Sequence, residues 1–382
     1  MSFFGSGFLI KTLNTFISIA AFYYFLNTKH SYFLTGFFIG VFWFWWIGLS
    51  FRYYNLTYFI PIVILFIGTG YGIIFWIIEK IFSKFNFLFI NSKILWALFL
   101  IFGFDFVSPF TFDWLKPEVL ISNSFFTPYK TTLFLILIAV ILKNYISIIL
   151  IISALLIPMP KIPKTPLKIN LITTYIPQDK KWDPKFIPIE IKNNFRYIKN
   201  SIGKYDAVVL PESAFPVFLN RHADIMKKLK HLSSKITIVT GALHEKNGNF
   251  YNSTYVFENG KVTIVDKHIL VPFGEYIPLP FFQKEINKIF FSDASDYKTS
   301  PHFSTFKIKN TEFINAICYE ATVKEVYKLK PNFIIALSNM AWFMPSTAPV
   351  LQKLLINVYV VQYKKRVYHS LNYFPSYILP KE

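Results

Sequence analysis

Long apolar blocks interrupted by few charges fill the first 158 residues, and they constrain the fold of this 382-residue chain more than any other feature. The blocks cover approximately residues 7–26, 32–49, 58–78, 94–107 and 131–158. A helix of about 20 apolar residues is long enough to cross a bilayer. Residues 1–158 are therefore predicted to form a bundle of transmembrane helices.

The last apolar block carries Lys143 and Asn144 in its middle, and such a pair is costly at the centre of a bilayer. We therefore expect two short helices with a tight turn at this pair, which gives about six helices in all. The first 25 residues hold Lys11 as their only charge and lack a small-residue cleavage site, so they are predicted to be a retained span.

Lysines in the short loops predict the orientation of this bundle. The positive-inside rule places the side richer in lysine in the cytoplasm. The lysines that share that side are Lys29, Lys80, Lys84, Lys93 and Lys143. The rest of the chain is then expected on the opposite face of the membrane.

Beyond residue 158 the pattern changes to short β-rich runs that alternate with helical patterns. Strands are predicted at 169–173, 207–210, 236–240, 253–258, 262–266, 313–318 and 333–337. Helices are predicted at 189–202, 218–232, 322–329 and 348–364. Residues 159–382 are thus expected to form an α/β domain in which helices cover the sheets.

The formal net charge of +19 excludes few partners by itself. The lysines are scattered singly, without a basic helix or an aromatic-basic RNA motif, so we do not expect nucleic acid binding. Attraction to anionic lipid headgroups is the better explanation of the excess positive charge. The seven histidines show no ligand spacing and no glycine-rich phosphate loop is present, so neither a metal nor a nucleotide cofactor is expected.

Cys318 is the only cysteine in the chain, and it follows the largely apolar run Phe313 to Ile317. Such a run is typical of a buried strand, and the polar residues Tyr319 and Glu320 come directly after it. An isolated free cysteine is more often a core residue than a nucleophile. The neighbouring strand ends favour the nucleophile.

Two further predicted strands end in groups that a purely structural strand would not need. Glu212 follows the run that starts at Ala207, and Lys267 follows the run that starts at Val262. Ends of neighbouring strands in an α/β sheet converge on one crevice. Each residue alone is more often a surface group, but together they supply a base and a cation for the thiol. Glu212 would accept the thiol proton, while Lys267 and the Tyr319 backbone N–H would stabilise an oxyanion.

Three segments carry a resemblance to a known family. They are Leu210-Pro-Glu212-Ser-Ala-Phe-Pro216, Asp266-Lys267-His-Ile-Leu-Val-Pro-Phe-Gly-Glu275-Tyr-Ile-Pro278 and Ala316-Ile-Cys318-Tyr319-Glu320. They look like the Glu, Lys and Cys motifs of the apolipoprotein N-acyltransferases, which are membrane members of the nitrilase, or carbon-nitrogen hydrolase, superfamily. Supporting matches are Ile176-Pro-Gln-Asp-Lys-Lys-Trp182-Asp, Tyr251-Asn252-Ser253 and Leu337-Ser-Asn-Met-Ala-Trp342-Phe343. The resemblance implies a nitrilase-like αββα sandwich on a membrane bundle.

The resemblance also implies an activity and a location. In this family a cysteine takes an acyl chain from a phospholipid as a thioester and passes it to the α-amine of the N-terminal diacylglyceryl-cysteine of an apolipoprotein, in ping-pong order. The enzyme would lie in the bacterial inner membrane with its catalytic domain in the periplasm. By motif match, Glu212 is the base, Lys267 the oxyanion cation and Cys318 the nucleophile. The supporting active-site residues are Glu275, Tyr319, Glu320, Trp182 and Asn252.

Two other functions remain open from the residues alone. A membrane-tethered nitrilase-type amidase would use the same three residues and resolve its thioester with water. A binding protein without activity would not need all three. The apolar segment Pro278 to Phe291 lies between catalytic motifs and is interpreted as a lid or membrane-dipping loop, with core packing as the alternative. Together with the bundle, it favours acyl transfer between lipids.

The chain departs from the family pattern at three places. Met340 and Met344 replace the usual acidic residue and glycine around the Ser-Asn-Met-Ala-Trp-Phe motif. The predicted bundle has one or two helices fewer than the family. The sequence reaches Glu382 without the further strands and final span that the resemblance implies. None of these differences removes a predicted catalytic group.

Overall fold

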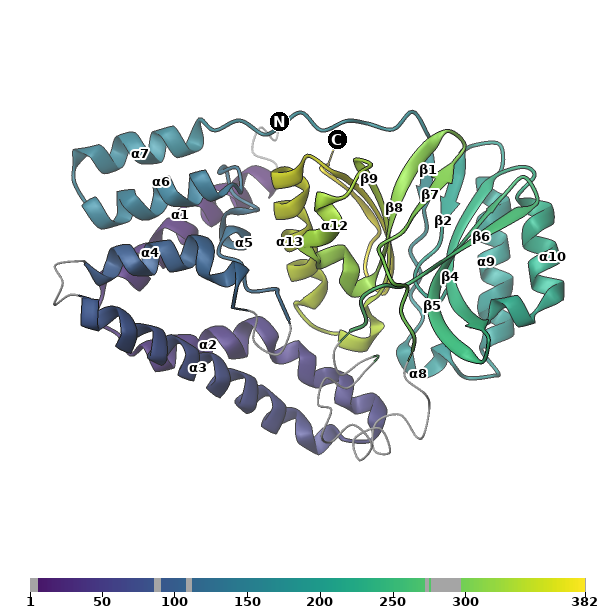
Figure 1. Ribbon diagram of the computed structural model, residues 1–382, viewed down its shortest axis with the longest axis horizontal. Coiled ribbons are helices and arrows are strands. Elements are labelled where there is room, and N and C mark those ends of the chain that lie inside the picture. Colours follow the sequence, from purple (N-terminus) through teal and green to yellow (C-terminus); the bar gives the residue numbers. More distant parts are fainter. Residues whose placement is uncertain (1–5, 86–90, 108–111, 272–274, 276–296, 382) are drawn as a thin grey trace. The chain divides into compact units, whose positions relative to one another are not determined.

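The computed structural model describes residues 6–85, 91–107, 112–271, 275 and 297–381 (Figure 1). The chain forms two compact units, which are interleaved along the sequence. The first contains Met1–Phe51, Leu56–Lys161 and Ser346–Gln362, and the second contains Arg52–Asn55, Ile162–Pro345 and Tyr363–Glu382. The four-residue segment Arg52–Asn55 therefore belongs to the second unit, although the rest of that unit begins only at Ile162.

The first unit is helical. The elements that lie wholly or mostly in it are α1 (Ser6–Asn27), α2 (Tyr32–Phe44), η1 (Trp45–Tyr54), η2 (Thr57–Phe59), α3 (Ile60–Phe85), α4 (Ser92–Phe102), η4 (Gly103–Asp105), α5 (Glu118–Ile121), α6 (Lys130–Leu142), α7 (Tyr145–Leu155) and α13 (Ala348–Tyr363). Within the described residues, three stretches are long and apolar enough to cross a membrane: Gly7–Asn27, Tyr32–Tyr54 and Thr57–Phe85. The expected total of about six spans stays a prediction, because α4, α6 and α7 are shorter.

The predicted turn at Lys143-Asn144 is confirmed. Lys143 ends α6 in the left-handed conformation, with φ of 53°. The Asn144 side chain then caps α7 by accepting from the Ile146 backbone N–H, and the Ser147 hydroxyl accepts from the Asn144 N–H. This capping box supplies partners for backbone donors that a helix start would otherwise leave unsatisfied.

Helices α2 and α3 pack closely because glycines lie where they meet. A Cβ at Gly36 would come within 2.5 Å of the Tyr71 carbonyl oxygen, and one at Gly40 within 2.9 Å of the Tyr71 Cβ. Gly68 and Gly72 play the same part on α3, facing side chains of α2. Small residues at four-residue spacing let helix backbones approach closely, as is common between membrane helices.

The second unit contains two sheets. Its strands are β1 (Ile169–Leu171), β2 (Ala207–Val209), β3 (Phe215–Phe218), β4 (Thr237–Lys246), β5 (Asn249–Glu258), β6 (Lys261–Asp266), β7 (Thr305–Ile308), β8 (Thr311–Ile317), β9 (Phe333–Asn339), β10 (Arg366–Asn372) and β11 (Tyr377–Leu379). Among the described residues the first sheet has the order β1-β2-β4-β5-β6, with β3 paired to β4, and the second has the order β11-β10-β9-β8-β7. Strands β1, β2 and β4 are parallel to one another, as are β8, β9 and β10.

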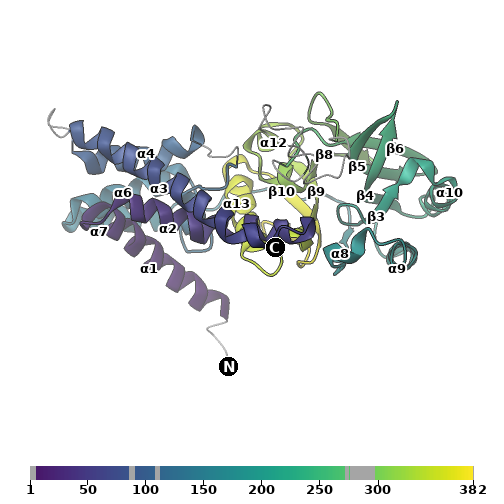
Figure 2. The same cartoon turned by 90° about the horizontal axis from the view of Figure 1, so that it is seen from below.

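Alternating side chains on β2 show how the layers stack. Ala207 and Val209 pack in a buried cluster with Phe313 and Leu337 of the second sheet. Val208 points the other way, into a cluster that includes Ile198. Period-two alternation of this kind places one strand between two layers. Helices α9 (Ile187–Ser201) and α10 (Ala223–Leu232) thus cover one face of the first sheet, and the second sheet covers the other (Figures 1 and 2).

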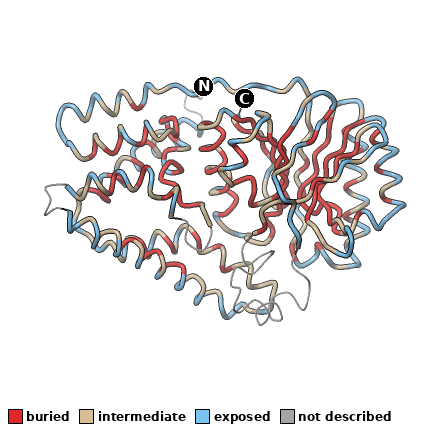
Figure 3. The backbone as a smooth tube through the Cα atoms, in the orientation of Figure 1, coloured by how far each residue is buried: buried red, intermediate tan, exposed pale blue. Residues whose placement is uncertain are grey.

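Burial follows this layering. Inner strands such as β2, β9 and β10 are the most continuously buried parts of the second unit, whereas α9 and α10 expose their outer faces (Figure 3). On the far side of the second sheet lies α12 (Lys324–Lys328), where Val326 and Tyr327 are buried (Figure 1). The fold class predicted from the sequence, apolar helices followed by a layered α/β domain, is therefore confirmed.

All seven predicted strands and all four helices predicted beyond residue 158 are present, with ends shifted by a few residues. The sequence analysis did not predict β10 and β11, which lie beyond Tyr363 and extend the second sheet. The sequence analysis also missed β3 and β7. These four strands are short or polar, and they acquire their apolar partners only from other strands.

Candidate active site

Glu212, Lys267 and Cys318 lie together in the second unit. The Cys318 thiol hydrogen-bonds the Glu212 carboxylate, and the charges of Lys267 and Glu275 act on it. One part of the prediction is wrong, since the three strand ends are not neighbours in one sheet. Glu212 follows β2 and Lys267 follows β6, with β4 and β5 between them, whereas Cys318 follows β8 of the other sheet. The site therefore forms across the two sheets.

Cys318 occupies the sharp turn between β8 and the 3-10 helix η7 (Cys318–Thr322). Its φ is +55°, in the left-handed region that non-glycine residues rarely adopt. Burial is the main cause that raises the pKa of its thiol well above the usual value, with the negative charge of Glu212 as the next. The Lys267 ammonium opposes this shift. The thiol is thus protonated at neutral pH and needs a base to become a nucleophile.

The Glu212 carboxylate is held by a hydrogen bond at each oxygen. Asn252 Nδ2 donates to Oε1 at 2.9 Å, and the backbone N–H of Asn339 donates to Oε2 at 2.8 Å. Burial raises the pKa of Glu212, while the Lys267 ammonium works against that rise. A carboxyl whose pKa is raised toward neutrality is a better base at physiological pH.

Lys267 is fully buried, and its ammonium Nζ lies 2.6 Å from Glu275 Oε2. Burial by itself lowers the pKa of Lys267, but the carboxylates of Glu275 and Glu212 outweigh it and the pKa is raised. Lys267 therefore stays positively charged and cannot act as a base. Asn252 Nδ2 also donates to Glu275 Oε1 at 2.9 Å, so one amide links the two carboxylates.

Glu320 connects the Lys267 segment to the Cys318 turn. Its Oε1 accepts from the backbone N–H groups of His268 and Ile269 at 2.7 and 2.9 Å, and its Oε2 accepts from Ile317 N–H at 2.7 Å. The side chain is almost fully buried. Glu320 therefore fixes the residues directly next to the cation and directly before the thiol, without occupying the position of a reacting group.

The structure places the two remaining predicted residues less centrally. Tyr319 is buried in the turn directly after the thiol, and its carbonyl accepts from the Thr322 hydroxyl at 2.7 Å. Trp182 ends helix α8 (Gln178–Lys181) and is 40% exposed. No hydrogen bond or ring contact joins Trp182 to the three central residues in the part of the chain that is described. The predicted lid at 278–291 lies outside the described residues.

Comparison with known proteins identifies the family. A model described as the apolipoprotein N-acyltransferase integral membrane domain matches residues 1–161, and the carbon-nitrogen hydrolase model matches residues 191–362. A protein of Campylobacter jejuni named apolipoprotein N-acyltransferase is 39% identical, over 100% of this chain and 86% of its own length. The chain belongs to the apolipoprotein N-acyltransferase family. Proteins of the same name from Helicobacter pylori and Wolinella succinogenes are 38% and 36% identical, over 96% and 97% of this chain and 88% and 89% of their own lengths.

Family membership confirms the enzyme class predicted from the sequence. The chain is an acyltransferase with an integral membrane domain and a carbon-nitrogen hydrolase domain. Membrane association and a role in lipoprotein N-acylation are supported by the same relatives. The amidase alternative is not favoured, since apolipoprotein N-acyltransferases match nearly the whole chain, including the helical half.

Residues 52–55 are part of this site region although they come from the N-terminal half. Arg52 Nη2 donates to the Met344 carbonyl at 2.6 Å, and the Tyr53 hydroxyl donates to the Ala341 carbonyl at 3.1 Å. The rings of Tyr53 and Trp342 meet edge to face with centroids 5.3 Å apart.

Several residues around Glu212 were missed. Tyr297 lies near Glu275 and Glu212. Its burial, and then the negative charges of these two carboxylates, raise the pKa of its hydroxyl to about 12. Asn339 and Asn372 each end a strand with a buried amide. The signal that selected Glu212 and Cys318, a polar group at the end of an apolar strand, would also have found Asn339, but not Asn372, whose strand is too polar to be predicted.

Proposed function

We propose that this enzyme transfers an acyl chain from a phospholipid to the α-amine of an apolipoprotein N-terminal diacylglyceryl-cysteine, through a thioester on Cys318. The observation that carries the proposal is the hydrogen bond between the Cys318 thiol and the buried Glu212 carboxylate, beside the Lys267 ammonium. The site thus combines a protonated nucleophile, a base that contacts it and a fixed positive charge. Acyl transfer by a thiol requires these three groups.

In the first half-reaction Glu212 takes the proton from the Cys318 thiol while the sulfur attacks the ester carbonyl carbon. Negative charge develops on the former carbonyl oxygen, where the Lys267 ammonium and the Tyr319 backbone N–H stabilise it. When the tetrahedral intermediate collapses, the bond to the ester oxygen breaks, and that oxygen receives the proton from Glu212. A thioester and a lysophospholipid result.

In the second half-reaction the neutral α-amine of the acceptor attacks the thioester carbon. Lys267 again stabilises the oxyanion, and Glu212 accepts the proton that the nitrogen loses. Collapse of the intermediate breaks the carbon–sulfur bond, and the proton returns from Glu212 to the sulfur. The products are an amide and the free thiol, so the enzyme is regenerated without a cofactor.

Two lipid substrates explain why such a site is joined to apolar helices. Neither substrate dissolves as a monomer, so both must reach the site from a bilayer. We propose that residues 1–158 form a multi-span bundle in the bacterial inner membrane and that residues 159–382 form the catalytic domain on the periplasmic side. The distribution of lysines between the loops supports this orientation.

Intact-mass spectrometry of the detergent-extracted protein, given phospholipid without acceptor, tests the proposal. We expect one added acyl chain that hydroxylamine removes, and no addition in Cys318→Ala. Adding a diacylglyceryl-cysteine peptide should then discharge the adduct onto the peptide amine. If Cys318 can be alkylated but takes no acyl chain from phospholipid, the proposed donor is wrong. Discharge to water at the same rate with and without the peptide would instead indicate a hydrolase.

A further inference from the structure

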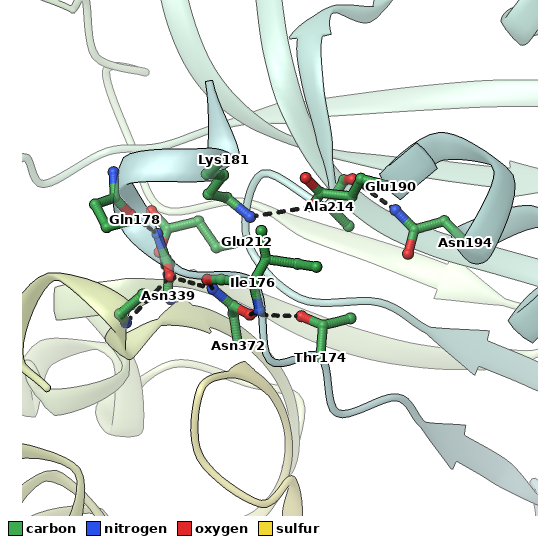
Figure 4. A network of polar contacts seen from close by, with 11 residues as sticks. Thr174, Ile176, Gln178, Lys181, Glu190, Asn194, Glu212, Ala214, Asn339 and Asn372 are labelled. Carbon is green, nitrogen blue, oxygen red and sulfur yellow. Dashed lines mark hydrogen bonds and ion pairs between the residues drawn. The ribbon is translucent and has the colours of Figure 1, made fainter. Parts of the chain in front are cut away.

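A buried polar network reaches the Glu212 carboxylate from the ends of β9 and β10 (Figure 4). Its first member is Asn339, whose backbone N–H donates to Glu212 Oε2 at 2.8 Å. That N–H belongs to the point where β9 passes into the 3-10 helix η8 (Met340–Phe343). The direction of the N–H therefore depends on how this turn is held.

The Asn339 side chain holds the turn. Its Oδ1 accepts from the Ala341 backbone N–H at 3.2 Å and from Asn372 Nδ2 at 2.7 Å. Its Nδ2 donates to Gln178 Oε1 at 2.8 Å. The amide thus contacts its own turn, the end of β10 and the start of α8, and its orientation is set by those partners (Figure 4).

Asn372 is the best anchored member of the network. Its Oδ1 accepts from the Thr174 hydroxyl at 2.8 Å and from Ile176 N–H at 2.9 Å. Its Nδ2 donates to the Ile176 carbonyl at 2.8 Å and to Asn339 Oδ1. The residue has no exposed surface. All four hydrogen-bonding positions of its amide are used, so rotating it would leave several buried groups unpaired.

We propose that Asn372 is a positioning residue for Glu212, acting through the Asn339 side chain and the Asn339 backbone N–H. This inference rests on the proposed function, because it gives Glu212 the role of base. Asn372 contacts neither the thiol nor Lys267 in the described structure. Its effect on the reaction is to keep the second oxygen of Glu212 occupied, so that the carboxylate presents a fixed geometry to the thiol.

Replacing Asn372 is therefore expected to raise the pKa of Glu212. A hydrogen bond to a carboxylate favours its charged form, so loss of the Asn339 N–H bond should make Glu212 harder to ionise. The charged and titratable groups that act on Glu212, or on which Glu212 acts, are Lys267, Glu275, Cys318, Lys181 and Tyr297. Asn372 hydrogen-bonds none of these groups in the described structure. A shift after its replacement would therefore report on the network.

The test measures the rate at which iodoacetamide alkylates Cys318 in the full chain in detergent, across a range of pH. Alkylation requires no lipid substrate, so it is independent of the acyl donor. The variants are Asn372→Leu, Glu212→Gln and the double variant. Ser370→Ala is the matched control, because the Ser370 hydroxyl donates to the Ile172 and Val209 carbonyls from the same strand but does not contact Asn339.

We expect a Glu212-dependent acidic limb in the wild-type profile, which Glu212→Gln removes. Asn372→Leu should move that limb to higher pH by about 0.5–1 unit, so that alkylation on the limb slows by about 3–10-fold. Ser370→Ala should keep the wild-type profile. In the Glu212→Gln background the Asn372 replacement should leave the alkylation profile unchanged, because Asn372 acts only through Glu212, which that variant has already replaced.

A folded Asn372→Leu variant with the wild-type profile would overturn the inference. So would a wild-type profile without the acidic limb, or an Asn372 effect that persists in the Glu212→Gln background. If Asn372→Leu does not fold, Gln178→Met removes the acceptor on the other side of Asn339 and carries the same expectations. The protein could also show all the expected alkylation profiles and yet accept no acyl chain from phospholipid. That result would refute the proposed donor while leaving this inference intact.

Discussion

Gly241 gives the sharpest test of how strictly the base must be placed. It lies on β4, directly beside the turn that carries Glu212, and its N–H donates to the Pro211 carbonyl at 3.2 Å. A Cβ added there would lie 2.5 Å from Ser213 N, 2.7 Å from Glu212 Cα and 2.9 Å from Pro211 O. All three are backbone atoms, so no side chain can rotate away.

The magnitude follows from these distances. Non-bonded heavy atoms rest at about 3.5–4.0 Å, so Gly241→Ala must separate β4 from the turn by about 1 Å. The Glu212 carboxylate cannot follow freely, because Asn252 and Asn339 hold its two oxygens. A displacement of about 1 Å at a reacting group can lower a rate by about 100-fold. The overpacking itself should cost about 1–3 kcal/mol of stability.

The assay is the rate of thioester formation from phospholipid, measured together with thermal unfolding. Gly203→Ala is the control, since Gly203 has φ of +75° and no atom within 4 Å of an added Cβ. Alanine in that conformation should cost a similar amount of stability, about 1–2 kcal/mol, without affecting the site. A Gly241→Ala enzyme that folds and keeps more than half of the wild-type rate would refute the reasoning. An equal loss in Gly203→Ala would show that stability alone is responsible.

Three further results are expected. Glu212→Gln should slow Cys318 alkylation at pH values where the wild-type Glu212 is ionised, because the amide cannot accept the thiol proton. The same variant should lose about 10²–10⁴-fold in acyl transfer, so unchanged transfer would exclude Glu212 as the base. Glu320→Gln should cost about 1–3 kcal/mol in thermal unfolding, because an amide cannot accept all three backbone N–H groups, and unchanged stability would contradict this. Lys181→Met leaves the buried Glu190 unpaired and should cost about 3–5 kcal/mol in urea unfolding, most of which Glu190→Leu should restore; no recovery in the double variant would argue against the ion pair as the cause.

The sequence by itself determined the fold class, apolar helices followed by an α/β domain, and it predicted the three residues that lie together in the candidate site. Apolar blocks and period-two runs are local patterns, so they indicate membrane helices and strands without knowledge of the partners. Glu212, Lys267 and Cys318 were found because each interrupts such a pattern at a strand end. The motif resemblance added Glu275, Glu320 and Asn252, and the structure places all three in contact with the site or its backbone.

The tertiary structure decided how these residues are held. The Asn339 N–H reaches Glu212 from 127 positions away along the chain, and the amide of Asn372 meets Thr174 across 198 positions. No local pattern encodes such a pairing, because an asparagine at a strand end satisfies the same local preferences whether it caps a turn or orients a base. Gly241 is likewise an ordinary strand glycine until the fold brings the Glu212 turn against it. Local hydrophobic patterning therefore predicts where chemical groups leave the core, whereas their alignment depends on long-range contacts that exist only in the folded chain.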